Sequence, residues 1–220
     1  MIGYWLVRAL RGALPGRTAG CLISQTLVDP GDPAFARPAK FVGPVYDEGQ
    51  ARELATERGW VVRRDRPAWR RVVPSPEPVG LLELPLIHAL LDTGTLVVCA
   101  GGGGIPVTRD ASDILHGAEA VVDKDLTAAL LARAVGADAL LLLTDVRAVI
   151  DGFGTSGARP IHHATPAELR TRSFPAGSMG PKVDAACRFV EATGHMAAIG
   201  SLDEAGALIR QEAGTIVSAA

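Results

Sequence analysis

The sequence predicts an α/β protein with a mainly parallel sheet, helices on both faces of that sheet and a small lid-like insertion. Short apolar runs alternate with amphipathic helical patterns from residue 85 onward, and a proline-punctuated stretch at residues 29–75 interrupts that rhythm. We therefore predict that residues 1–28 begin the core, residues 29–75 form the lid and residues 76–220 form the rest of the core. Because 48% of the residues are hydrophobic and only 5% are aromatic, this core should be aliphatic.

The first half of the chain predicts a helix, a strand and the lid. Apolar residues at helical spacing run from the start of the chain to Pro15-Gly16, which end the helix. Residues 21–28 predict a strand, whereas residues 29–46 contain four prolines and are expected to lack regular structure. The other predicted elements of the lid are a helix at residues 48–58 and two strands at 60–64 and 69–73.

The second half predicts a regular alternation of helices and strands. Apolar side chains recur at helical spacing in four stretches, which begin near residues 85, 126, 183 and 202. Three apolar runs between them predict buried strands, at residues 96–100, 139–143 and 196–199. Parallel strands joined by helices place their carboxyl ends along one edge of a sheet. Ligand-binding residues are therefore expected directly after the strands at 96–100 and 139–143.

Charge and cysteine content narrow the possible partners. The 220-residue chain has a net charge of −2, which offers no electrostatic footprint for nucleic acid or for an anionic membrane. No uninterrupted apolar run is longer than that at residues 139–143, which is far shorter than the ~20 residues that a transmembrane helix needs. The three cysteines are widely separated, odd in number and lie in apolar runs, which favours buried free thiols in a reducing compartment rather than disulfides or a zinc site. We therefore expect a soluble, cytoplasmic protein.

Four consecutive glycines give the strongest functional signal. Gly101, Gly102, Gly103 and Gly104 follow the predicted strand at 96–100, and Ile105-Pro106 prevents the chain from continuing directly into a helix. Glycines at the carboxyl end of a buried strand let the backbone approach a ligand closely and turn amide groups toward an anion. A flexible turn is the alternative interpretation. The spacing does not fit a Rossmann dinucleotide motif, although an acidic residue lies about the right distance downstream.

Two lysines stand beside predicted helix N-termini. Asp123-Lys124-Asp125 precedes the helix near residue 126, and Gly177-Ser178-Met179-Gly180-Pro181-Lys182 opens the helix near residue 183. Each motif combines a cation with the free amides and the positive dipole end of a helix, a combination that binds phosphate. The second motif is not a Walker A loop, because the Gly-Lys-Ser/Thr ending is missing. Ordinary helix capping is the alternative for both motifs.

Two further positions complete the predicted site. Thr144-Asp145-Val146 follows the strand at 139–143, and Lys40 lies in the lid between Pro38 and Pro44. A lid stiffened by prolines could deliver this charge when it closes. The alternatives are an ordinary turn and a solvated surface lysine. Fixed positive charges and backbone donors are the parts that phosphoryl transfer requires, so the sequence predicts a polyphosphate site.

The order of these motifs resembles that of the carbamate kinases, a group within the amino acid kinase family. The resemblance covers nearly the whole chain and rests on residues 29–46, 73–78, 101–106, 119–125, 143–146 and 177–183. It implies a three-layer α/β/α sandwich with a protruding lid, and reversible phosphoryl transfer between ATP and carbamate, commonly run to make ATP from carbamoyl phosphate and ADP. It also implies a homodimer, and a Mg²⁺ ion held by the nucleotide's phosphates with few or no protein ligands.

The resemblance further implies roles for the motif residues. Lys40 would be the lid lysine that reaches the transferred phosphoryl group, while Lys124 and Lys182 would bind the nucleotide's phosphates. Asp125 would orient the lysines, and the glycines at 101–104 would line the phosphate cleft. The residues implied to hold the rest of the nucleotide are Thr144, Asp145, Val146, Gly177, Ser178, Met179 and Gly180.

The chain also departs from the carbamate kinase pattern. Carbamate kinases have a further section before the point where this chain starts, and neither its Gly-Gly-Asn-Ala loop nor its Gly-Asn-Gly-Pro-Gln segment occurs here. Arg147 stands where the family usually has an acidic residue, and Val149-Ile150 lacks the usual tyrosine. Two hypotheses follow. The chain is the C-terminal, nucleotide-binding portion of an active carbamate kinase, or it is a non-catalytic remnant that binds nucleotide or forms a dimer.

Overall fold

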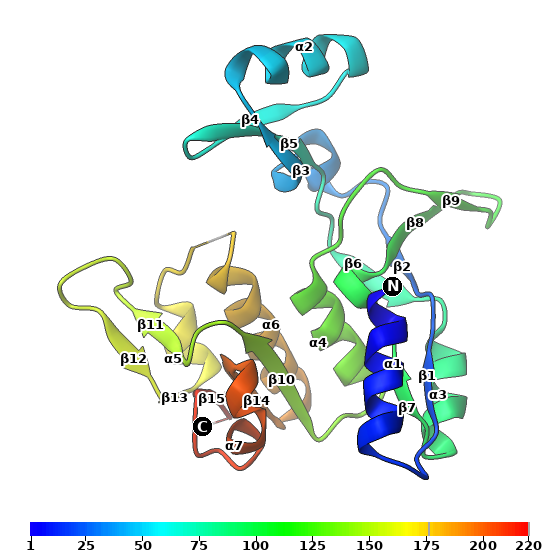
Figure 1. The fold of residues 1–220 in the computed structure, drawn as a ribbon, viewed down its shortest axis with the longest axis vertical. Coiled ribbons are helices and arrows are strands. Elements are labelled where there is room, and N and C mark those ends of the chain that lie inside the picture. The colour runs from blue at the N-terminus through cyan, green and yellow to red at the C-terminus, as the bar shows by residue number, and fades with distance from the viewer. Residues whose placement is uncertain (176, 220) are drawn as a thin grey trace.

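The computed structural model describes residues 1–175 and 177–219 as a body from which a lid projects (Figure 1). Helices cover the strands of the body, and one helix belongs to the lid. The helices are α1 (Ile2–Ala13), α2 (Glu48–Arg58), α3 (Leu84–Asp92), α4 (Lys124–Ala134), α5 (Pro166–Arg170), α6 (Met179–Thr193) and α7 (Ala205–Ile209). Three 3₁₀ turns accompany them: η1 (Pro33–Ala36), η2 (Gly101–Gly103) and η3 (Leu202–Glu204). None of the helices in the described residues has the length and apolar character needed to cross a membrane.

The strands of the body fall into several hydrogen-bonded groups. The first pairs β1 (Ala19–Cys21) with β7 (Leu96–Val98). The second has the order β6 (Pro78–Leu81), β2 (Gln25–Val28), β8 (Ile105–Arg109), β9 (Leu115–Gly117). The third has the order β10 (Ala139–Thr144), β14 (Met196–Ser201), β15 (Thr215–Val217), β13 (His163–Ala164), and β11 (Val149–Asp151) pairs with β12 (Arg159–Ile161). The pairs β1–β7, β2–β8, β10–β14 and β13–β15 are parallel, which confirms the predicted α/β class.

Helices α6 and α7 cover opposite faces of the sheet that contains β14. Ala197 and Ile199 of β14 pack in one cluster with residues of α4 and α6, whereas Ala198, between them, packs with Leu208 of α7. Successive residues of a strand point to opposite faces, so the sheet lies between two helical layers. Phe189 is the single aromatic residue among the buried hydrophobic residues described, which confirms the prediction of an aliphatic core.

The lid is a three-stranded antiparallel sheet covered by one helix. Its strands are β3 (Lys40–Tyr46), β5 (Ala68–Val73) and β4 (Val62–Asp65), in that order, and α2 packs on them. The prediction that residues 29–46 lack regular structure is therefore wrong for β3. The register of β3 against β5 shifts between Val42 and Tyr46, so that Pro44 lies where the ladder is interrupted and needs no N–H donor. The predicted helix at residues 48–58 is confirmed, with a capping box at its start.

Two predictions about the strands need correction, and one hairpin was not predicted. The single strand expected at residues 21–28 is divided between β1 and β2, which join different sheets. The strand expected at residues 96–100 ends at Val98, and its residues are half-buried rather than buried. The chain after the glycines forms the hairpin β8–β9, which the sequence did not predict, because β8 takes its place beside β2 through distant parallel pairing.

Candidate active site

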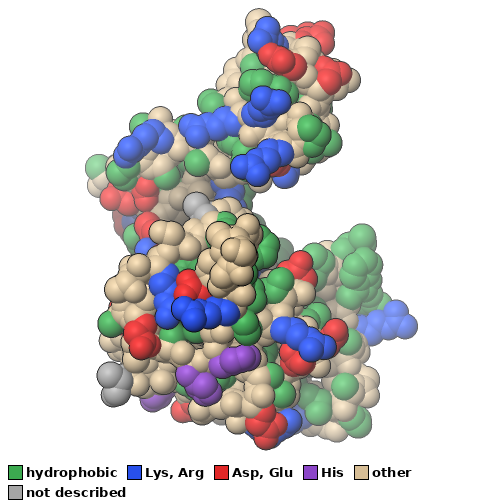
Figure 2. All heavy atoms as spheres, turned by 90° about the vertical axis from the view of Figure 1, so that its left-hand side faces the viewer, with side chains coloured by type: hydrophobic (Ala, Val, Ile, Leu, Met, Phe, Trp, Pro, Cys, Tyr) green, Lys and Arg blue, Asp and Glu red, His purple; other side chains and the backbone are tan. Residues whose placement is uncertain are grey.

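A cavity of about 450 Å³ opens where the lid meets the N-termini of α4 and α6 and the loop after β10. Figure 2 shows the lid standing off the body of the molecule, with several Lys and Arg side chains on it. The residues predicted for the site that line this cavity are Lys40, Gly102, Lys124, Asp125, Thr144, Asp145, Val146, Gly177, Ser178, Met179 and Lys182. The fold therefore brings the lid lysine, both helix lysines and the β10 loop to one place.

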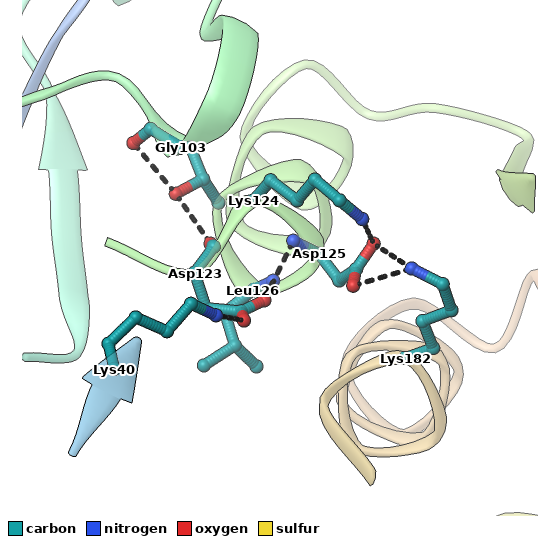
Figure 3. A network of polar contacts seen from close by, with 8 residues as sticks. Lys40, Gly103, Asp123, Lys124, Asp125, Leu126 and Lys182 are labelled. Carbon is teal, nitrogen blue, oxygen red and sulfur yellow. Dashed lines mark hydrogen bonds and ion pairs between the residues drawn. The ribbon is translucent and has the colours of Figure 1, made fainter. Parts of the chain in front are cut away.

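Three lysines meet two aspartates at this cavity (Figure 3). Lys182 Nζ lies 2.8 and 3.0 Å from the two carboxylate oxygens of Asp125, and Lys124 Nζ lies 2.8 Å from Oδ1 of the same carboxylate. Lys40 Nζ donates a hydrogen bond of 2.7 Å to Oδ2 of Asp123. Each ammonium has three N–H donors, and these contacts leave donors free for phosphate oxygens. Within this cluster three cations face two carboxylates, and the excess positive charge favours an anionic ligand at this end of the cavity, whereas the third lining carboxylate, Asp145, lies in the loop after β10.

The start of α4 holds two of these groups in place. Asp123 is the N-cap: its Oδ1 accepts hydrogen bonds from the amides of Asp125 at 2.9 Å and Leu126 at 3.4 Å. Its other oxygen remains available for Lys40. The capping interpretation is thus correct for Asp123, but the residue also ties the lid to the helix that carries Lys124.

Burial and ion pairing set the charge states of these groups. Asp123 is 7% exposed and Lys182 is 8% exposed. Burial acts to raise the pKa of Asp123, but the Lys40 ammonium and the helix amides outweigh it and lower the pKa below its usual value. Burial lowers the pKa of Lys182, with Lys124 adding to the effect. Burial also opposes the charge on Lys124, but the ion pair with Asp125 raises its pKa. Because two lysines share one carboxylate, a phosphate would supply the missing negative charge.

The glycine loop contributes one residue to the cavity surface. Gly102 lines the cavity with a φ of 74°, in the left-handed region that favours glycine. Gly101 is not among the lining residues, and a side chain built there would meet open space. Ala100, just before the loop, also has a positive φ of 53°, which is uncommon for a residue with a side chain. The loop is thus held in a tight conformation by its surroundings.

Gly103 and Gly104 pack closely against neighbouring residues and leave no space for a side chain. A Cβ at Gly103 would collide with the carbonyl oxygen of Val122, and one at Gly104 would collide with the hydroxyl of Thr26. The Gly103 carbonyl accepts hydrogen bonds from the hydroxyls of Thr26 at 2.7 Å and Thr127 at 3.1 Å. Thr127 belongs to α4, so these contacts fix the glycine loop against the helix whose N-terminus faces the cavity.

The start of α6 presents a second helix N-terminus to the cavity. Ser178 is its N-cap residue but makes no hydrogen bond to the helix through its side chain. Gly180 does not line the cavity; its amide donates a hydrogen bond of 2.9 Å to the carbonyl of Pro175, and a Cβ there would press on that carbonyl. Lys182, one turn into the helix, reaches back toward Asp125. The positive end of the helix dipole and this ammonium therefore act on the same region.

Apolar side chains line another part of the cavity. Thr144 ends β10, Asp145 and Val146 follow it, and Met179 begins α6. The apolar lining residues nearby in sequence are Ala148, Ile150, Phe153, Phe174 and Pro175. A cavity with ammonium groups in one part and aliphatic and aromatic groups in another suits a ligand that has both phosphates and a heterocyclic base.

Sequence reasoning missed the ion pair between Asp123 and Lys40 and the aromatic residues Phe153 and Phe174. Lys40 and Asp123 are 83 positions apart, and no local pattern links them. The only signal in the sequence for such ion pairing was that an aspartate stands on each side of Lys124. Within the described ranges, no three His, Cys, Asp or Glu side chains gather so that they could hold a metal ion.

Comparisons with known proteins agree with this geometry. The model of the amino acid kinase family matches residues 20–201. The carbamate kinase of Rhizobium meliloti (strain 1021) is 51% identical over 221 residues, an alignment that covers 99% of this chain and 68% of that protein. The carbamate kinase of Escherichia coli (strain K12) is 44% identical over 218 residues, which covers 99% of this chain and 72% of that protein.

A solved structure supports the same relationship. The carbamate kinase from Giardia lamblia bound to AMP-PNP is 37% identical and has a TM-score of 0.89, covering 100% of this chain and 72% of that chain. The three-layer α/β/α architecture with a protruding lid is therefore shared with that enzyme. The resemblance inferred from the order of the motifs is confirmed: the chain belongs to the amino acid kinase family and, within it, to the carbamate kinases.

Proposed function

We propose that this chain transfers a phosphoryl group reversibly between ATP and carbamate, so that carbamoyl phosphate and ADP yield ATP and carbamate. The main support is the cluster at the N-termini of α4 and α6, in which three lysines form ion pairs with Asp123 and Asp125. The lysines are Lys40, Lys124 and Lys182. The identity of 51% to a carbamate kinase over nearly the whole chain adds to it. ATP and ADP are therefore the proposed nucleotides.

In this proposal the two helix lysines bind the nucleotide's phosphates. Lys124 and Lys182 converge because Asp125 accepts a hydrogen bond from each, so this carboxylate orients them and need not move a proton. The N-termini of α4 and α6 add backbone donors and dipole charge, and Gly102 lets the loop backbone approach the phosphates. The residues proposed to hold the nucleoside and its first phosphate are Thr144, Asp145, Val146, Met179, Gly177 and Ser178.

Lys40 has the role of stabilising the group in transit. A phosphate oxygen of ADP attacks the phosphorus of carbamoyl phosphate, a new P–O bond forms, and the bond between phosphorus and the carbamate oxygen breaks. Negative charge is spread over the equatorial phosphoryl oxygens in the transition state. Lys40 leaves Asp123, to which it is now hydrogen-bonded, and its ammonium then neutralises part of that charge. No side chain has to form a covalent intermediate.

Three further proposals concern the setting of the reaction. Mg²⁺ would be held by the phosphate oxygens of the nucleotide and by water, with few or no protein ligands, because lysines engage the carboxylates of Asp123 and Asp125 and leave Asp145 as the one other carboxylate among the described lining residues. The protein is a homodimer, a proposal supported by the exposed apolar residues of α1. It works in the cytoplasm, which fits the free state of its cysteines, Cys21, Cys99 and Cys187. The prediction that these thiols are buried is correct for Cys187 but wrong for Cys21, which is exposed, and Cys99 is half-buried.

The decisive experiment measures ATP formed from ADP, Mg²⁺ and carbamoyl phosphate, with Lys40→Ala as the matched variant. The chain should make ATP, and the variant should bind ADP with similar affinity but turn over about 10²–10³-fold more slowly, as for loss of a transition-state donor. ADP binding without ATP formation would instead favour the alternative of a non-catalytic chain that binds nucleotide. Loss of both binding and turnover would leave only a dimerising remnant.

A further inference from the structure

Three contacts at alternate residues of one short segment join the lid to the body. The side chain of Glu119 forms an ion pair with Arg71 of the lid. The amide of Val121 donates a hydrogen bond of 3.0 Å to the carbonyl of Pro74, and Asp123 accepts a hydrogen bond from Lys40. Glu119 lies at a bend of the chain, and residues 120–123 follow it without regular secondary structure. This segment, residues 119–123, leads directly into α4.

The position of Arg71 in the lid is tied to that of Lys40. Arg71 lies in β5 opposite Val42 of β3, the strand that begins with Lys40. The guanidinium of Arg71 also stacks over the ring of Trp60, with 4.6 Å between its central carbon and the ring centroid. The Arg71 side chain is 24% exposed, so it is a fixed part of the lid surface rather than a free arm. A shift of Arg71 relative to the body therefore shifts Lys40 as well.

We propose that Arg71 and Glu119 are positioning residues for the phosphoryl transfer, an inference that rests on the proposed function. During transfer Lys40 must leave Asp123 for the phosphoryl group, so the hydrogen bond between Lys40 and Asp123 is lost and only the other two contacts join the lid to this segment. The Arg71–Glu119 pair and the hydrogen bond between Val121 and Pro74 then hold the lid at the angle at which Lys40 reaches the cavity. Neither Arg71 nor Glu119 touches the reacting atoms.

The strength of this pair suits a lid that must also reopen. The Glu119 side chain is 80% exposed, and exposed ion pairs are weak and sensitive to salt. Loss of such a pair shifts an equilibrium between closed and open lids by only about three- to fivefold. The pair can thus favour the closed lid without preventing product release.

A charge-swap series tests the proposal by kinetics. Glu119→Gln should lower kcat about three- to fivefold, and Glu119→Arg, which places two cations together, about tenfold, with the KM for ADP changed less than about twofold. Adding Arg71→Glu to Glu119→Arg should restore most of kcat. Glu57→Arg is the matched control, because Glu57 is an exposed lid residue with no ion pair in the part of the chain that the structure describes. It should behave as the unchanged chain does, and the Glu119→Gln effect should shrink at high salt.

Hydrogen exchange gives a second readout that needs no activity. The Val121 amide is protected by its bond to Pro74 only while the lid is docked, so Glu119→Arg should speed its exchange and the charge swap should slow it again. Unchanged kcat with unchanged exchange in Glu119→Arg, or a charge swap that restores neither, would overturn the proposal. A chain that makes no ATP counts against the proposed function alone, because the exchange rates still decide whether this pair holds the lid.

Discussion

At the scale of single residues, the site depends on carboxylates that serve two partners each. Asp125 accepts hydrogen bonds from both Lys124 and Lys182, and Asp123 divides its two oxygens between the α4 amides and Lys40. A shared carboxylate only partly neutralises each of its lysines. The remaining positive charge is therefore directed at whatever enters the cavity, and we expect a bound phosphate to complete the ion pairs that the protein leaves incomplete.

The role of Lys182 can be tested by its removal. Lys182→Ala should weaken the binding of ADP by ~1.5–3 kcal/mol, the range for hydrogen bonds to charged groups. Asp125 would keep Lys124 as a partner, so the carboxylate would not be left alone. Arg188→Ala is a matched control, because Arg188 lies on the same helix but does not line the cavity. Calorimetry that finds equal ADP affinity for Lys182→Ala and the unchanged chain would refute the assigned role.

Residues with a local signal were predictable, and residues with a distant partner were not. Lys124 and Lys182 each stand beside a helix N-terminus that the sequence marks by itself, and both line the cavity. Asp123 was predictable as a helix cap but not as the partner of Lys40, because that pairing depends on how the lid folds over the body. Local chemistry therefore identified the parts of the site, and tertiary contacts determine which of them touch.

At the scale of elements, the charge on Asp123 links the stability of α4 to pH. Because its pKa is lowered in the folded protein, its stabilising effect should be present above the ordinary pKa and be lost as the pH falls through the lowered value. Asp123→Asn, which keeps a good N-cap but not the charge, should be less stable than the unchanged chain at pH 7. The urea concentrations at which Asp123→Asn and the unchanged chain are half unfolded should converge as the pH drops below about 4, the ordinary pKa range for aspartate.

A second variant separates the cap of α4 from the charge. Asp123→Ala loses both, and loss of the cap alone costs about 0.5–2 kcal/mol, so Asp123→Ala should unfold at lower urea than Asp123→Asn at every pH. If the difference in urea midpoint between Asp123→Asn and the unchanged chain stayed constant from pH 7 to pH 3, this result would contradict the role given to the Lys40 ion pair.

Two glycines of the loop should differ in how much stability is lost when each is replaced by alanine. Gly103→Ala should destabilise the protein by about 1–3 kcal/mol or more, because Gly103 has a φ of 107° and no space for a Cβ beside Val122. Gly101→Ala should stay within about 0.5 kcal/mol, since a Cβ there meets open space. Denaturant unfolding of both variants measures the difference. Equal losses of stability would mean that the loop does not hold the conformation described here.

Whole elements were predictable where a local pattern and the tertiary structure agree. The helix α2 has its own capping box, and its predicted bounds match. The strand β3 was missed because the four prolines of residues 29–46 argue against regular structure, yet Pro44 alone lies within the strand and the interrupted register accommodates it. The strand β8 was missed because its pairing with β2 joins residues about eighty positions apart in the chain. Such pairing is set by the packing of the sheet, which a local window does not contain.

At the scale of the whole molecule, α1 and the sheet beside it leave apolar surface uncovered. The helix packs on β1 and β7 at the edge of the body (Figure 1), yet none of its residues is buried. Trp5 is 57% exposed, and the residues of β7 are only half-buried. Contiguous apolar surface of this kind favours association, because each Å² removed from water contributes roughly 25 cal/mol.

We therefore predict that the chain is dimeric or larger in solution and only marginally stable as a monomer. Trp5→Lys should weaken the association, because it places a charge on the exposed apolar face of α1. Leu202→Lys, at a residue of η3 that is also exposed, should not. Sedimentation velocity over a range of concentrations measures both effects. A sharp monomer with a cooperative melt above ~65 °C, beyond the usual mesophile range, would contradict this prediction. In that case the contacts of α1 with β1 and β7 would suffice to make the chain a self-sufficient unit despite its exposed apolar face.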